Sequence, residues 1–542
     1  MLPPHPLYYL HNFQRALDWL AARYGDLFDD TEQAFLDAFA GLPEASRALL
    51  VRLLGRKGEL FRSDRLRYEE IGNVQQAAEP LLALGWLSPD PLLDVEALLR
   101  LYTKAELAAL ADARLRKDAM REQLLQAHPQ PRHHRQWRPQ AGEQVWKVDV
   151  QALCDRLRLM FFGNLRQQWD EQLLADIGVF QYERVPLDAA SRAFQTRADV
   201  DQYLQLHLWR EQLETAGPTP ALLDAVLDYA PAHPWLAMRR AKLLLRLGQA
   251  SERVADWAAA QRAYAASAYR GARHRRLRVL ERQGAFEQAY ALARQAQARP
   301  EDDSEAQRLA RMLPRLCRQL GLARPTPVQG PAIPLVRLQL PRTPQDRRVE
   351  DVARQALAEP GAVVCYVENA LVNSLFGLLC WDAVFAPLPG AFFHPFQRGP
   401  ADLASPDFAR RRQALFDGCL GQLDDGRYRA TIEDRYVAKQ GLQSPFVAWD
   451  ILTPDLLALA LDCMAPADLR SLFERLLQDV PTYRSGLPDL IRFWPQQRRY
   501  ELIEVKGPGD RLQDNQIGWL QHCLARGVTV QVCHIAWDDA CA

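Results

Sequence analysis

The chain has 542 residues, with 67 Lys and Arg balanced by 67 Asp and Glu, so its formal net charge is zero. A composition of 48% hydrophobic and 25% charged residues is typical of globular proteins and excludes global disorder, and the length predicts several domains. No apolar run approaches the ~20 residues of a membrane-spanning helix, and the N-terminus lacks the basic-then-apolar order of a signal peptide. The 9 Cys include no CxxC pair, which indicates reduced thiols in the cytoplasm and disfavours a structural zinc site. Only 7 of the basic residues are Lys, a bias typical of GC-rich coding in bacteria.

The N-terminal part of the chain has helical periodicity. Apolar residues recur at spacings of three and four over residues 13–24 and 33–60, with a break at residues 41–43. A second helical pattern covers residues 94–126. The basic, Pro-bearing segment 128–140 that follows is predicted to be a linker.

Residues 150–215 also predict helices, and the pattern then changes to short helices joined by tight turns. Two similar breaks, at residues 246–249 and 282–285, lie 36 positions apart, close to the ~34-residue period of tetratricopeptide (TPR) hairpins. Small residues and aromatic residues stand where paired helices would interlock. The aromatic residues are Trp257, Tyr264, Phe286 and Tyr290.

Residues 322–344 contain six prolines and are predicted to be a linker between domains. The sequence after this segment predicts an α/β domain, because short apolar runs alternate with helical periods. The expected elements are a helix after Arg348, a strand at 362–367, a helix at 369–385, strands at 487–494 and 500–506 with a turn between them, a helix at 513–526 and a strand at 528–535.

The two C-terminal strands carry the residues with the clearest chemistry. Because strand side chains alternate between faces, Glu504 and Lys506 point one way and Val505 points to the core. Pairing of the strands as a hairpin brings Asp489 beside Glu504. Two carboxylates and the Val505 carbonyl are oxygen ligands of the kind that Mg²⁺ prefers. Lys506 then supplies a positive charge that orients a metal-activated water or stabilises a phosphate transition state.

This motif, Pro-Asp followed by Glu-Val-Lys, is short, and its specificity depends on how rare its residues are. Of the 7 Lys, only Lys506 has an acidic residue two positions earlier, and of the four Pro-Asp pairs only 488–489 precedes such a triplet at hairpin distance. A surface hairpin with a cross-strand salt bridge would use the same residues, so the pattern alone leaves both interpretations open.

The residues around the motif resemble the VRR-NUC nuclease module and, within it, the Fanconi-associated nuclease family. The resemblance is carried by GLPDLIRFW, ELIEVKGPGDRLQDNQIGWL and VQVCHI, and upstream by Glu368-Asn369, LFGLLCWD and VAWD. It covers the chain from about residue 360 to the end. A fainter similarity extends to Arg56-Lys57 and LRYEEI near the N-terminus.

This resemblance implies a restriction-endonuclease-like core and assigns roles to residues within it. The three metal-binding acids of the family match Glu368, Asp489 and Glu504. Its active-site Lys matches Lys506, and a Gln aimed at the site from the following helix matches Gln516. The implied activity is Mg²⁺- or Mn²⁺-dependent phosphodiester hydrolysis, with 5′-flap cleavage and 5′→3′ exonucleolytic cutting in interstrand crosslink repair. Judged without the resemblance, Glu368 would be a helix cap and Gln516 an exposed helical residue.

A nuclease must hold its DNA, and phosphate contacts need clustered Lys and Arg. Residues 239–282 contain 12 basic and 3 acidic residues, although an Arg-rich solvated helix face gives the same count. Residues 103–125 resemble a SAP motif in which Thr103 and Glu106 form a capping box. The usual Gly of that motif is absent, so a plain amphipathic helix pair is the alternative. The candidate DNA-binding residues are Arg56, Lys57, Arg62, Arg65, Lys117 and Arg135.

Together these patterns predict a multidomain protein with all-α N-terminal and TPR-like helical regions followed by an α/β restriction-endonuclease-like core. The expected segments are a helical DNA-binding domain at 1–90, a SAP-like unit with a basic linker at 91–150, a helical/TPR-like domain at 151–321, a Pro-rich linker at 322–344 and a VRR-NUC nuclease domain at 345–542.

The expected partner is branched or 5′-flap double-stranded DNA, bound by a monomer at the nucleoid of a bacterial cytoplasm. There is no Walker A motif, so no ATP-driven step is expected, and no membrane partner is expected. Two alternatives stay open. One is a Holliday-junction resolvase or restriction-type nuclease, and the other is a non-catalytic helical-repeat DNA-binding scaffold.

Overall fold

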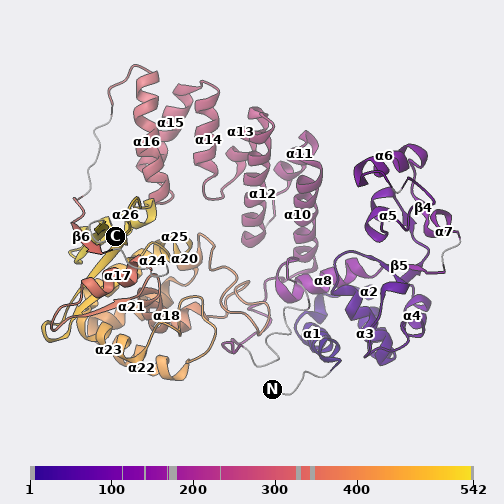
Figure 1. Ribbon diagram of the computed structural model, residues 1–542, viewed down its shortest axis with the longest axis horizontal. Coiled ribbons are helices and arrows are strands. Elements are labelled where there is room, and N and C mark those ends of the chain that lie inside the picture. The colour runs from indigo at the N-terminus through magenta and orange to yellow at the C-terminus, as the bar shows by residue number, and fades with distance from the viewer. Residues whose placement is uncertain are drawn as a thin grey trace. The chain divides into compact units, whose positions relative to one another are not determined.

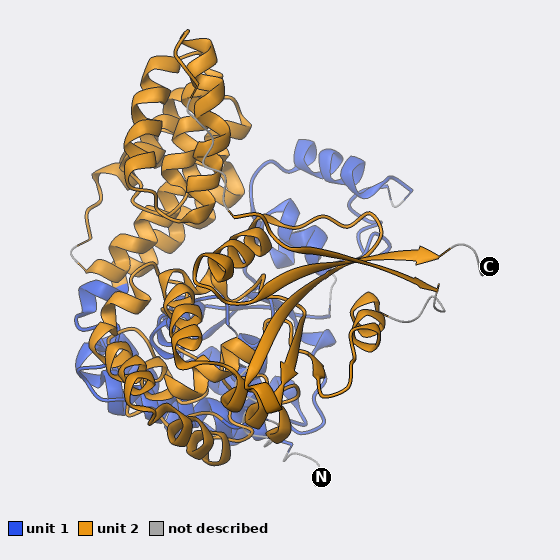
Figure 2. Ribbon diagram, turned by 90° about the vertical axis from the view of Figure 1, so that its left-hand side faces the viewer, with its two compact units in different colours: residues 1–181, 187–200 blue, residues 182–186, 201–542 orange. Residues whose placement is uncertain are grey.

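The computed structural model describes residues 6–112, 114–139, 142–167, 169, 180–231, 233–324, 331–341 and 348–538. Two compact units divide the chain, and they are coloured separately in Figure 2. Unit 1 is Met1–Gln181 with Leu187–Val200, and unit 2 is Tyr182–Pro186 with Asp201–Ala542. Within the described ranges, every helix is too short or too polar to cross a membrane.

Unit 1 begins with helices that pack around aromatic residues. Phe13 and Phe39 meet with their ring centroids 5.4 Å apart, and Asp29 with Glu32 forms a capping box at the start of the second helix. The helices are α1 (Tyr8–Tyr24), α2 (Asp30–Gly41), α3 (Glu44–Leu54), α4 (Val74–Ala83) and α8 (Gln151–Phe162).

A small antiparallel sheet in unit 1 was not predicted. Its order is β1-β5-β2, from Leu60–Arg62, Val145–Val148 and Leu87–Pro89. The helix predicted to reach residue 60 therefore stops at the end of α3. Strands of three or four residues are too short to show the two-residue alternation on which a sequence prediction depends.

The segment predicted to be SAP-like contains α5 (Val95–Leu101) and α6 (Lys117–Ala127). Thr103 and Glu106 make the predicted reciprocal bonds: Thr103 N donates to Glu106 Oε2 at 2.8 Å, and Glu106 N donates to Thr103 Oγ1 at 3.4 Å. The residues they bracket form turns rather than a helix.

The basic linker predicted at residues 128–140 is wrong over most of its described length. It contains β4 (Arg132–His133), which pairs with β3 (Leu92–Leu93), and α7 (His134–Trp137). Trp137 is 1% exposed, and its Nε1 donates to the Leu93 carbonyl at 3.0 Å. The segment is folded because Trp137, a large apolar side chain among basic residues, is buried in the core.

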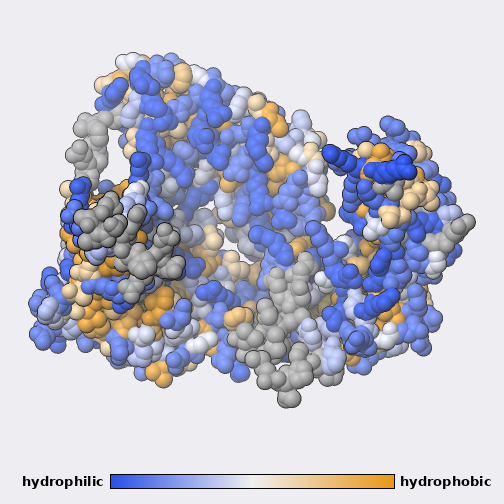
Figure 3. Space-filling model, in the orientation of Figure 1, coloured by the Kyte–Doolittle hydropathy of each residue, from blue (hydrophilic) through white to orange (hydrophobic). Residues whose placement is uncertain are grey.

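A row of helices follows, here called the helical row, and its members stand side by side in Figure 1. Hydrophilic residues cover most of its visible side in Figure 3. Only part of the helical stretch predicted at 150–215 is borne out, because residues 180–196 form no helix and 170–179 lie outside the described residues. The helices are α10 (Arg197–Ala216), α11 (Pro220–Asp228), α12 (Pro234–Arg253), α13 (Trp257–Ala266), α14 (Ala272–Arg282), α15 (Phe286–Ala298) and α16 (Asp303–Gln319).

One of the two predicted breaks in this row is wrong. Helix α12 continues through residues 246–249, where Gly248 lies against the ring of Tyr264 so closely that a Cβ would collide with it. Gly248 therefore serves helix packing, and α12 ends instead near Ala255, whose φ is 59°. The second break is confirmed: Gly284, with φ of 73°, separates α14 from α15.

The C-terminal part of unit 2 is built on a five-stranded mixed sheet of order β6-β10-β9-β8-β7. Strand β9 is parallel to β10 and antiparallel to β8, and helix α26 (Asp514–Ala525) connects β9 to β10. The predicted order of strand, strand, helix and strand is confirmed. The strands are β6 (Leu335–Pro341), β7 (Val363–Tyr366), β8 (Leu490–Trp494), β9 (Arg499–Lys506) and β10 (Val530–Asp538).

Strand β6 corrects the prediction that residues 322–344 are only a linker. It pairs in parallel with β10, and Leu338 and Leu340 pack against the core of the sheet. Apolar residues at alternate positions make this strand, and Pro341, which lacks an N–H donor, stands at its end. Pro325, Pro327 and Pro344 of the predicted linker lie outside the described residues.

Helices cover the sheet and fill the long connection between β7 and β8. Helix α17 (Val349–Ala356) packs on the face to which Val505 points. The predicted helix at 369–385 is present as α18 (Leu371–Leu379) and α19 (Trp381–Val384). The remaining helices are α20 (Phe408–Arg411), α21 (Gln413–Asp425), α22 (Tyr428–Ala438), α23 (Pro454–Cys463), α24 (Pro466–Gln478) and α25 (Val480–Tyr483).

Candidate active site

The antiparallel pairing of β8 with β9 brings Asp489 beside Glu504. Leu490 pairs with Ile503, so the residue before β8 comes opposite Glu504. Asp489 Oδ2 accepts a hydrogen bond from the Val505 N–H at 2.8 Å, and the Asp489 carbonyl accepts one from the Val367 N–H at 2.9 Å. The predicted hairpin geometry is therefore confirmed, with the end of β7 fastened to the same place.

Glu504 is fully buried and is held on one side by two donors. Its Oε1 accepts hydrogen bonds from Lys506 Nζ at 2.8 Å and from Gln516 Nε2 at 2.6 Å. Gln516 is itself oriented, because its Oε1 accepts from the Gln513 N–H at 2.9 Å in the first turn of α26. Glu504 Oε2 is buried without a hydrogen-bond partner in the described part of the chain. One carboxylate oxygen thus stays free for a ligand.

The two facing carboxyls have raised pKa values. Burial raises the pKa of Asp489 to about 6, with Glu368 and Glu350 adding to the rise while the Val505 N–H and Lys506 oppose it. Burial raises the pKa of Glu504 to about 7, the charge of Asp489 adds to it, and Lys506 opposes it. Two buried carboxyls that repel each other attract either protons or a cation.

Glu368 lies two positions after the end of β7, and its side chain is exposed. Its carboxylate accepts hydrogen bonds from the Tyr366 hydroxyl and from Asn369 Nδ2. It does not cap α18, which begins after Ala370 without a side-chain cap. Glu368 raises the pKa of both Asp489 and Glu504, so its charge acts on the same site. Its role as a metal ligand stays a prediction, because no three His, Cys, Asp or Glu among the described residues form a group arranged to hold a metal ion.

The donor atoms at the site nonetheless suit a hard divalent cation. The free Glu504 Oε2, the Asp489 carboxylate and the neighbouring Val505 carbonyl are all oxygens, which Mg²⁺ and Mn²⁺ prefer to nitrogen or sulfur. An unpartnered buried carboxylate oxygen is costly unless something binds it.

Three further residues shape this site and were missed from the sequence. Tyr366 holds Glu368, Glu350 on α17 acts on Asp489, and Asp510 Oδ2 accepts from the Gly507 N–H at 3.0 Å in the turn after β9. Tyr366 lies on the predicted strand 362–367 but Glu368 lies beyond its end, so strand alternation did not place the two side chains together. No motif marks Glu350, which joins the site through the packing of α17.

Helix α26, which carries Gln516, is fastened by a buried arginine of α24. Arg475 Nη2 donates to the Gly518 carbonyl at 2.9 Å and to Asp303 Oδ2 of α16 at 2.8 Å. Its guanidinium also lies over the Tyr483 ring, 4.3 Å from the centroid. Arg475 therefore links the helical row to the helix that orients Glu504.

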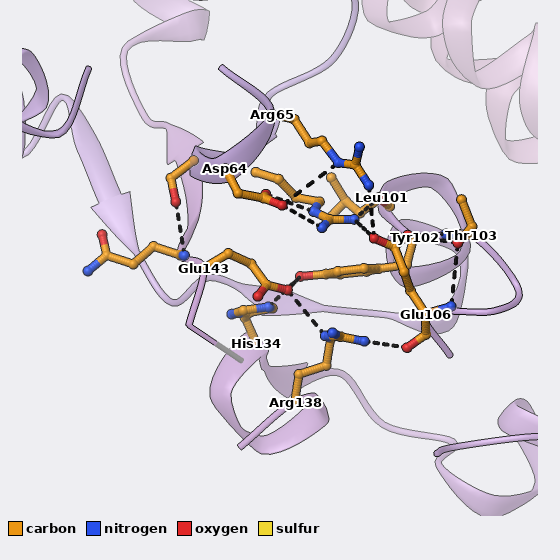
Figure 4. A network of polar contacts seen from close by, with 12 residues as sticks. Asp64, Arg65, Leu101, Tyr102, Thr103, Glu106, His134, Arg138 and Glu143 are labelled. Atoms are coloured by element: carbon orange, nitrogen blue, oxygen red, sulfur yellow. Dashed lines mark hydrogen bonds and ion pairs between the residues drawn. The ribbon is translucent and has the colours of Figure 1, made fainter. Parts of the chain in front are cut away.

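The six candidate DNA-binding residues lie in unit 1, and three of them share a cavity of about 400 Å³: Arg62, Arg65 and Lys117. Arg62 is 7% exposed, and its guanidinium pairs with Asp64 and Glu106 and lies 4.3 Å from the Tyr102 ring centroid. Figure 4 shows how its neighbours Asp64, Tyr102 and Glu106 converge. Arg62 has a structural place in this network.

The other candidates are more accessible. Arg65 and Lys117 are exposed, although Arg65 also pairs with Glu106 at 3.1 Å. Arg56 donates to the Tyr68 hydroxyl at 3.2 Å, and Lys57 and Arg135 expose their side chains. These five remain available for phosphate contacts, and their role stays a prediction.

Much of the positive charge predicted along residues 239–282 is neutralised within unit 2. Arg262 pairs with Asp224 at 2.7 Å, and Arg273 Nε donates to Glu305 at 2.9 Å. The acids come from neighbouring helices, so a count over one stretch of sequence overstates the surface charge.

Three family models match parts of the chain. The FAN1 HTH domain matches residues 7–88, the Fanconi anemia-associated nuclease SAP domain matches residues 92–137, and the VRR-NUC domain matches residues 423–537. The last match contains β8, β9, α26 and most of β10, and Glu368 precedes it.

Relatives of known identity match almost the whole chain. The Fanconi-associated nuclease 1 homolog of Pseudomonas aeruginosa is 52% identical, over 99% of this chain and 97% of that protein. The homolog of Oryza sativa is 25% identical over 99% of this chain, which spans 63% of that protein. A crystal structure of paFAN1 bound to 2-nt 5′-flap DNA with a gap matches with a TM-score of 0.89 and 52% identity, over 99% of this chain and 100% of that chain. The multidomain, helix-rich architecture with a mixed C-terminal sheet is common to both structures, and the chain belongs to the Fanconi-associated nuclease family.

Proposed function

We propose that this protein is a structure-specific DNA nuclease that hydrolyses phosphodiester bonds with Mg²⁺ or Mn²⁺. Its activities are 5′-flap endonuclease and 5′→3′ exonuclease, used in the repair of interstrand crosslinks. The observation that carries the proposal is the buried pair of Asp489 and Glu504 with Lys506 and Gln516 on the same carboxylate. It is supported by 52% identity to a protein solved with 5′-flap DNA.

The residues that would hold the cation are Asp489, Glu504 and the carbonyl of Val505. Glu368 joins them when its carboxylate turns away from the Tyr366 hydroxyl. A bound divalent cation supplies an activated water and neutralises charge on the scissile phosphate. No His or Cys is needed for such an oxygen-rich site.

Two other residues act on Glu504: Lys506 places a positive charge beside it, and Gln516 orients its carboxylate. Lys506 Nζ, 2.8 Å from Glu504 Oε1, is a point charge that lowers the pKa of Glu504 and lies where an attacking water or a phosphate oxygen would pass. Gln516 fixes Glu504 Oε1, so that Oε2 faces the ligand. A carboxylate held in one rotamer loses little entropy when it binds, which favours catalysis.

The remaining segments would grip the DNA. The regions matched by the HTH and SAP models offer the exposed Arg56, Lys57, Arg65, Lys117 and Arg135 to backbone phosphates. The helical row would act as a TPR-like spacer that carries the nuclease domain. Binding as a monomer at the bacterial nucleoid, without ATP, completes the proposal.

The test is a cleavage assay on labelled 5′-flap, 3′-flap and four-way-junction DNA, with Mg²⁺ or Mn²⁺ and with EDTA. The proposal predicts metal-dependent cutting of the 5′ flap in preference to the other substrates, and loss of cutting in Asp489→Ala. Symmetrical cutting of the four-way junction would point to a resolvase instead. Intact DNA binding without any cleavage would point to a non-catalytic scaffold.

A further inference from the structure

A second polar pocket lies next to the proposed metal site within unit 2. Its volume is about 450 Å³, and its walls include Arg398, Arg484, Asn369, Asn373 and the segment 443–450. Asn369 directly follows Glu368, and Arg484 precedes Asp489 by five residues. The pocket therefore opens beside the carboxylates without sharing any of them.

Two arginines face this pocket without a carboxylate partner. Arg398 Nε donates to the Ser444 carbonyl at 2.8 Å, and Arg484 Nη2 donates to the Pro445 carbonyl at 2.6 Å. Neither forms an ion pair within the described part of the chain, and Asp450, the carboxylate in the wall, is exposed. Burial and the charge of Arg398 lower the pKa of Arg484. Two cations held in place by carbonyl groups and lacking a counter-charge favour an anion.

Asn373 leaves one acceptor in the wall of the pocket unsatisfied. It is 5% exposed, and its Nδ2 donates to the carbonyls of Asn369 at 2.6 Å and Arg484 at 2.9 Å. Its Oδ1 is buried with no partner in the described residues. A buried acceptor in the wall of a pocket is satisfied by a water that donates to it, and the same water can donate to a phosphate oxygen, which carries no donor of its own.

We propose that this pocket binds a backbone phosphate of the DNA strand, adjacent to the phosphate that is cut beside Asp489 and Glu504. The guanidinium groups of Arg398 and Arg484 would take the two non-bridging oxygens, since a planar fork of N–H donors matches phosphate geometry. The inference rests on the proposed nuclease function and adds a positioning site to it. Such a site sets the register of the strand and so the cleavage position.

The experiment combines protein variants with DNA in which one phosphate at a time is a neutral methylphosphonate. Single-turnover cleavage of a 5′ flap is measured for wild type, Arg398→Gln, Arg484→Gln and Arg484→Lys. The control is Arg427→Gln, which removes an equal charge from a side chain that is 72% exposed and, among the described residues, forms its ion pair with Asp425. Binding of the same DNA without metal is measured at several salt concentrations.

We expect one linkage near the cut to slow wild-type cleavage by roughly 10- to 100-fold when it is neutral, the range for a charge-assisted hydrogen bond. Arg484→Gln should show the same loss on normal DNA and no further loss at that linkage, and Arg484→Lys should restore part of the rate. In Arg398→Gln and Arg484→Gln, the slope of log Kd against log salt concentration should fall by about 0.9, the value for one phosphate contact. If the ligand is instead a terminal 5′-phosphate, Arg398→Gln and Arg484→Gln should cleave more slowly than wild type only on substrates that carry a 5′-phosphate.

The proposal is overturned if Arg398→Gln and Arg484→Gln match Arg427→Gln in rate and in salt dependence while wild type cleaves normally. Absence of cleavage by wild type would instead refute the proposed function, and the binding data would still report on the pocket. Melting temperatures of all variants separate loss of folding from loss of the contact, and Arg484→Lys provides the comparison if Arg484→Gln is unstable.

Discussion

The link between Arg475 and α26 yields a quantitative prediction for Arg475→Met. Met keeps most of the apolar stem of the side chain but leaves the Gly518 carbonyl and the Asp303 carboxylate without their donor. A hydrogen bond to a charged group contributes about 1.5–3 kcal/mol, and the stacking on Tyr483 about 0.5–1 kcal/mol. The expected loss is about 2–4 kcal/mol in the free energy of unfolding.

The same change should lower catalysis beyond its effect on stability. Gly518 is two residues from Gln516, so a looser α26 allows Gln516 Nε2 to leave Glu504 Oε1. We expect kcat on a 5′ flap to fall while KM for DNA stays nearly constant, because no contact with DNA has been removed.

The assays are denaturant unfolding and steady-state cleavage, with Arg470→Met as the matched control. Arg470 lies on the same helix, donates to the Leu420 carbonyl at 2.9 Å and pairs with the exposed Asp424 at 2.7 Å, and neither contact involves α26. The surface ion pair is worth about 0–1 kcal/mol. If Arg475→Met and Arg470→Met lose equal stability and equal kcat, Arg475 does not position α26.

Three other predictions address packing, metal binding and DNA binding. Gly248→Ala should destabilise the protein by about 1–2 kcal/mol in denaturant unfolding, because its Cβ meets the Tyr264 ring, whereas Gly418→Ala in an open helical position should be neutral or stabilising; equal effects would contradict the close packing. Mn²⁺ should raise the melting temperature of wild type but not of Glu504→Gln, with about 2.7 kcal/mol of stabilisation at 100 times the Kd, and an equal rise in both would place the cation elsewhere. Lys117→Ala should reduce the slope of log Kd against log salt by about 0.9, and an unchanged slope would remove Lys117 from the DNA contacts.

The hairpin that carries Asp489 and Glu504 was predictable because the two residues lie on consecutive strands, close together in the sequence. The turn between β8 and β9 is short, so alternation along two neighbouring strands was enough to place Asp489 beside Glu504. Glu368 lies far upstream in the sequence, and only the family resemblance connected it to the site. Its observed contact with Tyr366 could not be read from either source.

The errors arose where tertiary packing decides the role of a residue. Strand β6 was assigned to a linker because prolines surround it, and its partner β10 lies at the other end of the domain. Gly248 was interpreted as a helix break, although its small size admits the Tyr264 ring. Arg62 was predicted to bind DNA because of its charge, but its guanidinium forms ion pairs with Asp64 and Glu106. Sequence periodicity carries no information about such distant partners.

The most direct test of the central claim is the single-turnover rate of 5′-flap cleavage as a function of Mn²⁺ or Mg²⁺ concentration in wild type and Glu504→Gln. We expect a saturable metal dependence in wild type and a rate more than about 100-fold lower in Glu504→Gln, with DNA affinity unchanged, since changes to groups that only support metal ligands already cost about 10- to 100-fold. Equal rates in the two proteins, or cleavage that persists in EDTA, would contradict the assignment of the Asp489 and Glu504 pair as the metal-dependent nuclease centre.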